Sequence, residues 1–244
     1  MFRTPALILT ALLMTGVAST ASAATYEAGK HYDVLPQAQR TNVAPGKVEV
    51  MEVFSYGCPA CDHFQPVMKK LKAALPPNAQ LVYLPASWNT AENWPTFQRA
   101  YLTAKSLGVA DKAHDQMFSA IWNTGGELAI QQSGPGSPLK KNLPTIDDIA
   151  RFYQKVAGTK PADFVAASKS FSVDLKMRQA DAQIIAMKVQ STPTLVVNGK
   201  YRINNEAIQT PEDVIGIVRF LVDKEAGGAK PAQAPAPAAP AKKS

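Results

Sequence analysis

The sequence predicts an α/β protein in which a helical region interrupts a strand-rich domain. Two observations favour this class. Strand-like runs occur near both ends, at 48–56 and 194–203, whereas residues 86–171 carry mainly helical patterns. The chain has 244 residues, of which 46% are hydrophobic and 18% charged, and this is enough for a sizeable core. We therefore expect an α/β fold with an inserted helical domain.

The first residues are typical of a secretory signal peptide. Arg3 supplies a positive charge, an apolar stretch runs over residues 6–17, and residues 21–23 form an A-x-A cleavage site. An uncleaved membrane anchor is the alternative, but the stretch is too short to cross a bilayer. We expect cleavage after Ala23 and export to an oxidising compartment, where disulfide chemistry is possible.

A strand-helix-strand unit should follow. Residues 48–56, VEVMEVFSY, are mostly β-branched, apolar or aromatic and predict a buried strand. Pro59 suits the first position of a helix, where its missing N–H costs nothing. Pro66 should kink this helix. Residues 80–84 predict a second short strand. The apolar residues at helical spacing in between are Phe64, Val67, Met68, Leu71 and Leu75.

Helical spacing dominates the region after residue 86. A Gly- and Pro-rich loop at 123–144 divides it, and Thr145 with Asp148 forms a capping-box variant ahead of an apolar run. Helices should begin near Thr90, Asp111, Thr145, Pro161 and Ser172.

Strand signals return near the C-terminus. Residues 194–197 and 200–203 are joined by Asn198-Gly199, which is the strongest short-range signal for a β-hairpin. Residues 210–213, TPED, have the cap, proline and acids of a helix start.

The predicted organisation follows from these elements. Residues 24–85 and 172–225 should form the strand-rich domain, and 86–171 the helical insert. Residues 226–244 are rich in Ala, Pro, Gly and Lys, so we expect a disordered tail.

The charge balance does not indicate a nucleic-acid-binding protein. The formal net charge is +7 and the isoelectric point is near 9.3. The lysines are scattered, no basic helix is interleaved with aromatic residues, and the export signal separates the protein from nucleic acid. We expect no nucleic-acid partner.

The only two cysteines, Cys58 and Cys61, lie three positions apart at the expected start of a helix. A bond between them closes a very short loop and restricts the unfolded chain little, so a purely structural role explains them poorly. Disulfide exchange needs an attacking thiolate and a second thiol that resolves the mixed disulfide. This pair, a redox-active disulfide when oxidised, supplies both.

Position on the helix predicts a different role for each thiol. Cys58 should lie at the cap, where free N–H groups and the helix dipole stabilise an anion and lower its pKa. Cys61, one turn inside, should be less exposed. We therefore expect Cys58 to be the nucleophile and Cys61 the resolving thiol, with Pro59 and Ala60 between them.

A structural zinc site is the main alternative for the pair. Such a site needs about four ligands, and a second cysteine pair is absent. The histidines are His31, His63 and His114. The nearest to the pair is His63, and its position on the helix does not suit a metal site shared with both thiols. We expect neither a metal nor another cofactor.

Two further residues are candidates for the site. Glu52 shares a strand face with Val50 and Phe54, so its pKa should be raised and it could relay protons to Cys61, although a solvated charge at a strand edge is the alternative. Pro193 directly precedes a strand. A cis bond there would expose the backbone of Thr192 for pairing with an extended peptide, but trans bonds are the common case.

Several segments together resemble the DsbA family of periplasmic thiol-disulfide oxidoreductases. They are ATYEAGKHY at 24–32, FSYGCPAC at 54–61, Ser191-Thr192-Pro193 and VNGKY at 197–201, and the resemblance covers about residues 25–223. It implies a thioredoxin fold with an inserted helical domain, a cis Pro193 beside the cysteine pair, and Glu52 at the family's buried acidic position.

The resemblance also implies a function. The oxidised form would pass its disulfide to newly exported, unfolded proteins, and a DsbB-like, quinone-linked membrane protein would reoxidise it. Family members often have His where this chain has Ala60. That His helps to stabilise the nucleophile's thiolate, so we expect a less oxidising protein than the strongest members.

Other functions remain open at this stage. A disulfide reductase or isomerase would use the same pair, although isomerases of this class usually carry a dimerisation domain, and none precedes the motif here. We also expect a monomer. A peptide-binding chaperone whose cysteines are incidental is the alternative from another class.

Overall fold

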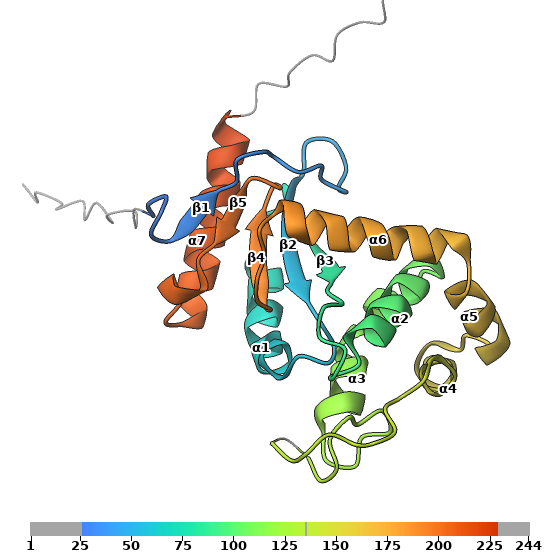
Figure 1. Ribbon diagram of the computed structural model, residues 1–244. Coiled ribbons are helices and arrows are strands. Elements are labelled where there is room, and N and C mark those ends of the chain that lie inside the picture. The colour runs from blue at the N-terminus through green and yellow to red at the C-terminus, as the bar shows by residue number, and fades with distance from the viewer. Residues whose placement is uncertain (1–25, 135, 229–244) are drawn as a thin grey trace, which may run out of the picture.

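A five-stranded mixed sheet forms the centre of the molecule (Figure 1). The computed structural model describes residues 26–228 except residue 135, so the expected signal peptide and its cleavage site lie outside the described residues. The strand order is β1-β5-β4-β2-β3, and only the β2–β3 pair is parallel. The strands are β1 (Tyr32–Val34), β2 (Val48–Phe54), β3 (Ala79–Pro85), β4 (Thr194–Val197) and β5 (Tyr201–Ile203).

Seven α-helices and a short 3-10 turn accompany the sheet in the described residues. Helices α1 and α7 cover one face, while α2 to α6 gather beside the sheet (Figure 1). The helices are α1 (Pro59–Ala74), α2 (Trp94–Ser106), α3 (Ala110–Trp122), α4 (Ile146–Ala157), α5 (Pro161–Ser168), α6 (Phe171–Ala186) and α7 (Pro211–Gly228), and the 3-10 turn is η1 (Asn205–Ala207).

Strand β2 is central, and all seven of its residues are buried. Its alternate side chains belong to two separate cores. Val50 packs with residues of α1 and α7, whereas Met51 and Val53 pack with the aromatic core of the helical region. Glu52 pairs with Leu195 of β4 and therefore faces the α1 and α7 side. The strand thus directs an acid beneath the helix that carries the cysteines.

The hairpin and two helix caps expected from the sequence are confirmed. Asn198 and Gly199 connect β4 to β5 with φ values of 52° and 61°, as an Asn-Gly turn requires. The Thr145 hydroxyl accepts from the Asp148 N–H while Asp148 accepts from the Thr145 N–H. Thr210 begins α7 with the same reciprocal bonds to Asp213.

Three expected boundaries differ from the structure. Strand β2 ends at Phe54, because residues 55–57 turn into α1. Helix α2 begins at Trp94 rather than near Thr90; its cap, Asn93, has a φ of 63° and donates its side-chain amide to the Pro144 carbonyl at 2.8 Å. Helix α7 continues to Gly228, three residues beyond the expected end of the domain at residue 225.

The domain limits stay a prediction, and residues 229–244 lie outside the described part of the chain. Helix α1 runs through Pro66 as one element. In residues 26–228, residue 135 apart, none of the helices has both the length and the hydropathy of a membrane-spanning segment.

Candidate active site

The cysteine pair lies where β2 turns into α1. Cys58 caps the helix in an extended conformation, with φ −94° and ψ 116°, and its N–H donates to the Ser55 carbonyl at 3.2 Å. The Cys58 Sγ accepts a hydrogen bond from the Cys61 N–H at 3.3 Å. The expected cap position is therefore confirmed, and a backbone donor at the helix start points at the sulfur.

The turn before the cysteines is held by the helical region. The Trp122 indole N–H donates to the Tyr56 carbonyl at 2.8 Å. A Cβ on Gly57 would lie 2.3 Å from the Glu92 carbonyl oxygen and 2.8 Å from the Trp94 ring. Only glycine fits this close approach. The helical region thus fixes the backbone on which Cys58 stands.

The two thiols lie in different environments. Both are free in this structure, with Cys58 5% exposed and Cys61 fully buried. The hydrogen bond with the Cys61 side chain lowers the pKa of Cys58 to about 6; burial opposes this, and contacts with Thr192 and the N–H groups of Cys61 and Ala60 assist it. Burial raises the pKa of Cys61 far above its ordinary value. One thiol is thus an anion at neutral pH and the other stays protonated.

The loop before β4 lies against the nucleophile. The Thr192–Pro193 bond is cis, as the resemblance implied. In its protonated form the Cys58 thiol donates to the Thr192 carbonyl at 3.6 Å, and the Pro193 carbonyl accepts from the Asn205 side-chain amide at 2.9 Å. Thr194 Oγ donates to the Ser191 carbonyl at 2.7 Å. Residues 134 positions apart in the chain thus meet at one sulfur.

Glu52 is fully buried, and neither oxygen of its carboxyl group has a hydrogen-bond partner among the described residues. Burial, assisted by a negative charge on Cys58, raises its pKa to about 8. Its charge in turn raises the pKa of Cys61. The acid is therefore protonated at neutral pH and electrostatically coupled to both sulfurs.

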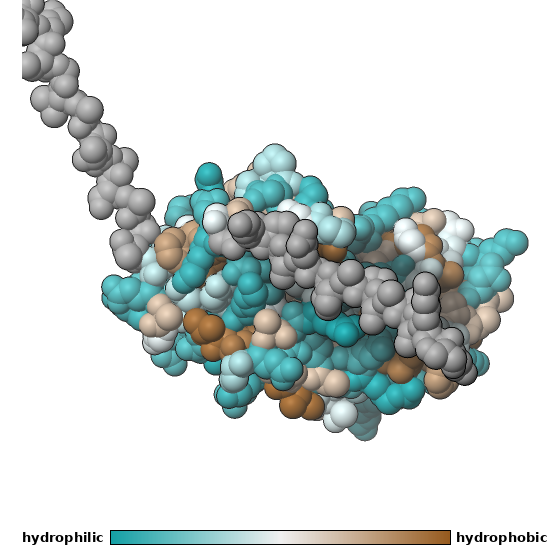
Figure 2. All heavy atoms as spheres, turned by 90° about the horizontal axis from the view of Figure 1, so that it is seen from above, coloured by the Kyte–Doolittle hydropathy of each residue, from teal (hydrophilic) through white to brown (hydrophobic). Residues whose placement is uncertain are grey.

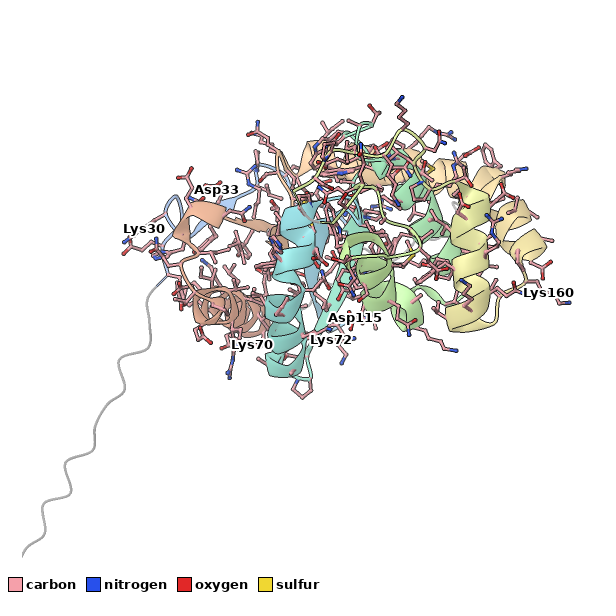
Figure 3. All side chains as sticks on the ribbon, turned by 90° about the horizontal axis from the view of Figure 1, so that it is seen from below. Lys30, Asp33, Lys70, Lys72, Asp115 and Lys160 are labelled. Atoms are coloured by element: carbon pink, nitrogen blue, oxygen red, sulfur yellow. The ribbon has the colours of Figure 1, made fainter. Side chains whose placement is uncertain are left out.

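A second polar group lies buried beside the site. His114 Nδ1 is 3.0 Å from the Tyr56 hydroxyl, and the His114 ring packs against Tyr83 in a tilted arrangement with 4.2 Å between centroids. Burial lowers the pKa of His114 to about 4, so the ring is neutral at pH 7. The cavity beside it has a volume of about 100 Å³, and Lys72 and Asp115 lie together at its rim between α1 and α3 (Figure 3).

Sequence reasoning missed several of these residues. His114, Trp122 and Asn205 lie in no motif, and Tyr56 lies in the FSYGCPAC segment without any sign there of its contacts; the partners of these residues lie 12 to 66 positions away in the chain. Gly57, directly before Cys58, was the one signal of a close backbone approach.

Known proteins match this chain over most of its length. The Thioredoxin family model matches residues 44–217. The thiol:disulfide interchange protein DsbA of Pseudomonas aeruginosa is 33% identical, over 92% of this chain and 98% of that protein. The chain belongs to the DsbA family. The DsbA of Pseudomonas syringae is also 33% identical, over 88% of this chain and 92% of its own length.

Solved structures agree with this assignment. DsbA from Xylella fastidiosa superposes with a TM-score of 0.70 at 31% identity, over 83% of this chain and 98% of that one. DsbA from P. aeruginosa gives 0.68 at 31% identity, over 83% and 95%. The fold is therefore the thioredoxin fold with a helical insertion, and the protein is a periplasmic thiol-disulfide oxidoreductase of the DsbA kind, as the sequence predicted.

Proposed function

We propose that Cys58 is the nucleophilic sulfur of this DsbA and Cys61 the resolving one. The observation that carries the assignment is the asymmetry of the pair: Cys58 caps α1 with a lowered pKa, whereas Cys61 is fully buried with a raised one. A thiolate of low pKa is both a ready nucleophile and a good leaving group. Pro59 and Ala60 set the spacing between the two.

Disulfide donation then takes two exchanges. A thiolate of the substrate attacks Cys58 Sγ; the S–S bond to Cys61 breaks, and Cys61 leaves with the electron pair and takes up a proton. A second substrate thiolate attacks the substrate sulfur of the mixed disulfide, and Cys58 leaves as a thiolate. The substrate gains one disulfide, and the enzyme ends as the dithiol.

We assign to Glu52 the transfer of a proton to and from the Cys61 sulfur. A buried thiolate is costly, so the leaving sulfur needs a proton as the bond breaks. Glu52 is protonated at neutral pH, and its charge is coupled to that of Cys61. It would give a proton to Cys61 during donation and take one back during reoxidation.

Thr192 and Pro193 are the proposed substrate-binding residues. The Thr192 carbonyl lies 3.6 Å from Cys58 Sγ, next to the cis bond. A strand-like segment of the substrate that paired with this backbone would bring its cysteine to Cys58.

The remaining assignments concern partners and place. The substrates would be unfolded polypeptides newly exported to the periplasm, and a DsbB-like, quinone-linked membrane protein would reoxidise the dithiol. The signal peptide would be cleaved after Ala23, and the mature protein would act as a monomer.

Two single variants test the assignment of the thiols. Cys58→Ser should abolish oxidative refolding of a reduced substrate. Mixed with a substrate that already contains a disulfide, Cys61→Ser should instead accumulate the mixed disulfide formed by attack of the Cys58 thiolate, because the Cys61 thiol that would attack Cys58 Sγ and release the substrate is missing. Mass spectrometry identifies the trapped species. A Cys58→Ser protein with substantial oxidase activity, or a mixed disulfide trapped through Cys61 in preference to Cys58, would reverse the roles.

A further experiment concerns Ala60. Titration against glutathione should give a less oxidising potential than that of family members with His at this position, and Ala60→His should make the protein more oxidising. The reason is that a histidine there would stabilise the Cys58 thiolate and hence the reduced form. A potential unchanged by Ala60→His would contradict this explanation.

A further inference from the structure

Helix α6 presents an apolar stripe to solvent. Phe171 is 74% exposed and Ile185 75% exposed, and Leu175 between them is also exposed. With Arg178 and Ala182 these residues form the α6 stripe, at intervals of four, three, four and three residues, and such spacing places them on one face of a helix. The stripe is roughly 20 Å long.

The opposite face of α6 explains why the stripe is exposed. Val173, Ala180 and Ile184 are buried, and α6 packs there against α2. The helix therefore already has its partner in the fold. Among the described residues, the other exposed large apolar side chains lie singly on separate segments, at Val34, Trp88 and Leu107. Single exposed residues are ordinary, whereas an aligned set indicates an interaction surface.

The charges of α6 are distributed unevenly. Both acids lie along one flank of the stripe and are engaged by side chains of neighbouring segments: Asp174, whose side chain is 40% exposed, accepts from Arg99 at 2.7 Å, and Asp181 accepts from Ser87 at 2.7 Å. Arg178 lies in the stripe, 5.9 Å from the centre of the Phe171 ring. Exposed Lys169 and Lys188 lie just beyond the two ends of the helix. The exposed surface thus combines apolar and positive groups.

A groove continues this surface. It lies between α6 and the segment at 37–42, has a volume of about 700 Å³, and is lined by amides, alanines and Arg40, with no acid. Gln183 bridges it by a hydrogen bond to the Arg40 carbonyl at 3.5 Å. Amide and guanidinium donors beside an apolar stripe suit the phosphate layer of a lipid surface.

We propose that α6 is a peripheral membrane-binding surface, which places its stripe in the headgroup layer of a bilayer containing anionic phospholipids. Apolar side chains and basic charge on one face are the two components of such binding. Figure 2 looks down on the side of the molecule where α6 lies and shows brown spheres scattered among teal ones.

Two other occupants fit the surface less well. A second copy in antiparallel pairing would bring the two Arg178 side chains together at the centre of the contact, where like charges repel. A specific partner helix normally selects its target by charges beside the apolar seam. On one flank of this stripe the exposed residues are Ser172, Gln179 and Ala186, which carry none, and on the other flank Asp174 and Asp181 are already engaged by side chains of this chain.

The proposed orientation is compatible with catalysis. In Figure 1, α6 lies above α2, and the turn from β2 into α1 lies below both. A bilayer in contact with the exposed face of α6 would leave Cys58 directed toward the aqueous compartment. Membrane binding and disulfide exchange would then be independent.

The test is co-sedimentation of the full mature chain with vesicles. We expect binding to phosphatidylcholine mixed with phosphatidylglycerol, little binding to phosphatidylcholine alone, and weakening by salt. Phe171→Ser combined with Ile185→Ser should lower the partition coefficient at least about tenfold, because two large apolar contacts are lost. Val34→Ser, an exposed apolar residue on β1, is the matched control and should bind normally.

Other variants separate this proposal from its rivals. Cys58→Ser should bind vesicles normally, and the double variant should keep its oxidase activity and thermal unfolding midpoint, which shows that it is folded. The proposal is overturned if the chain does not bind anionic vesicles or if the double variant binds equally well. It is also overturned if binding depends on residues 229–244 alone, or if the stripe instead supports a dimer by light scattering.

Discussion

Two carboxyl groups of this DsbA, Glu52 and Glu225, have opposite environments at opposite ends of the chain. Glu52 is fully buried under α1 without a hydrogen-bond partner, and its pKa is raised to about 8. Glu225 is about 10% exposed at its side chain. It accepts hydrogen bonds from Lys200 at 2.6 Å, from Tyr201 at 2.9 Å and from Asn198.

The pKa of Glu225 shows what these partners do. Burial alone would raise it, but the hydrogen bonds from Lys200, Asn198 and Tyr201 outweigh burial and hold it below its ordinary value. Glu225 is therefore an anion that joins α7 to the β4–β5 hairpin. The same residue type stabilises the fold at one site and is held neutral at the other. The buried carboxyl of Glu52 has no hydrogen-bond partner in the described part of the chain and therefore lowers the stability of the fold. The difference indicates that Glu52 serves to exchange a proton at the cysteine pair rather than to stabilise the structure.

The largest expected effect is on stability between about pH 4.5 and 8. A group with a raised pKa contributes stability below its unfolded value, near 4.5, and loses that contribution as pH rises through its folded value, about 8. Reduced wild type should therefore lose on the order of 4 kcal/mol of unfolding free energy over this window relative to Glu52→Gln. Denaturant unfolding at several pH values measures it.

Glu212→Gln is the matched control, because that carboxyl is exposed on α7 and should leave the profile unchanged. If wild type and Glu52→Gln lost stability in parallel between pH 5 and 8, Glu52 would not be the buried neutral acid described above.

The next effect is kinetic. Glu52→Gln should slow the resolution of a mixed disulfide by Cys61 roughly 10²-fold near pH 8, where a large fraction of Glu52 is ionised in wild type, because Cys61 then loses its proton acceptor. Formation of the mixed disulfide by Cys58 should change little, since Glu52 is neutral over the range in which Cys58 ionises. Stopped-flow kinetics with a disulfide peptide separates the two steps. Equal slowing of both steps would indicate a general disturbance of the site rather than proton transfer.

A smaller effect should follow at the other carboxyl group. Glu225→Ala should cost about 1–3 kcal/mol at pH 7, because the hairpin donors lose a shared acceptor. The contribution of Glu225 to the free energy of unfolding depends on pH in the opposite direction to that of Glu52. Because the pKa of Glu225 is lowered, this contribution is present above about pH 4.5 and is lost as pH falls. Wild type and variant should therefore converge in acid. A difference that stayed constant down to pH 3 would argue against an ionised Glu225.

The smallest effect concerns the loop before β4. Asn205→Ala removes the donor to the Pro193 carbonyl and should raise the KM for a peptide substrate about threefold, with little change in kcat. Steady-state kinetics measures this, and Glu206→Gln on the same turn is the control. A change in kcat alone would place Asn205 outside substrate positioning.

Local signals account for the parts that the sequence predicted. The Cys58 cap, the Thr145 capping box and the Asn198-Gly199 turn each depend on residues within a few positions of one another. The burial of Glu52 was also accessible, because alternation along β2 places it among apolar neighbours.

Long-range contacts account for what was missed. Helix α2 starts at Trp94 and not near Thr90, because its cap, Asn93, is held by a hydrogen bond to Pro144, 51 positions away. The sequence near Thr90 gives no sign of that contact. The pairing of Tyr56 with His114 joins residues 58 positions apart. Such contacts form only when the helical region packs against the sheet, so one sequence carries no local trace of them.

The central claim is that the start of α1 stabilises an anion on Cys58 while Cys61 stays protonated. Titration of the reduced protein, followed by the ultraviolet absorbance of the thiolate, tests it most directly. We predict a single ionisation with an apparent pKa of about 6 that disappears in Cys58→Ser. An ionisation near the free-thiol value of ~8.5, or one that survives in Cys58→Ser and is lost in Cys61→Ser, would contradict the account.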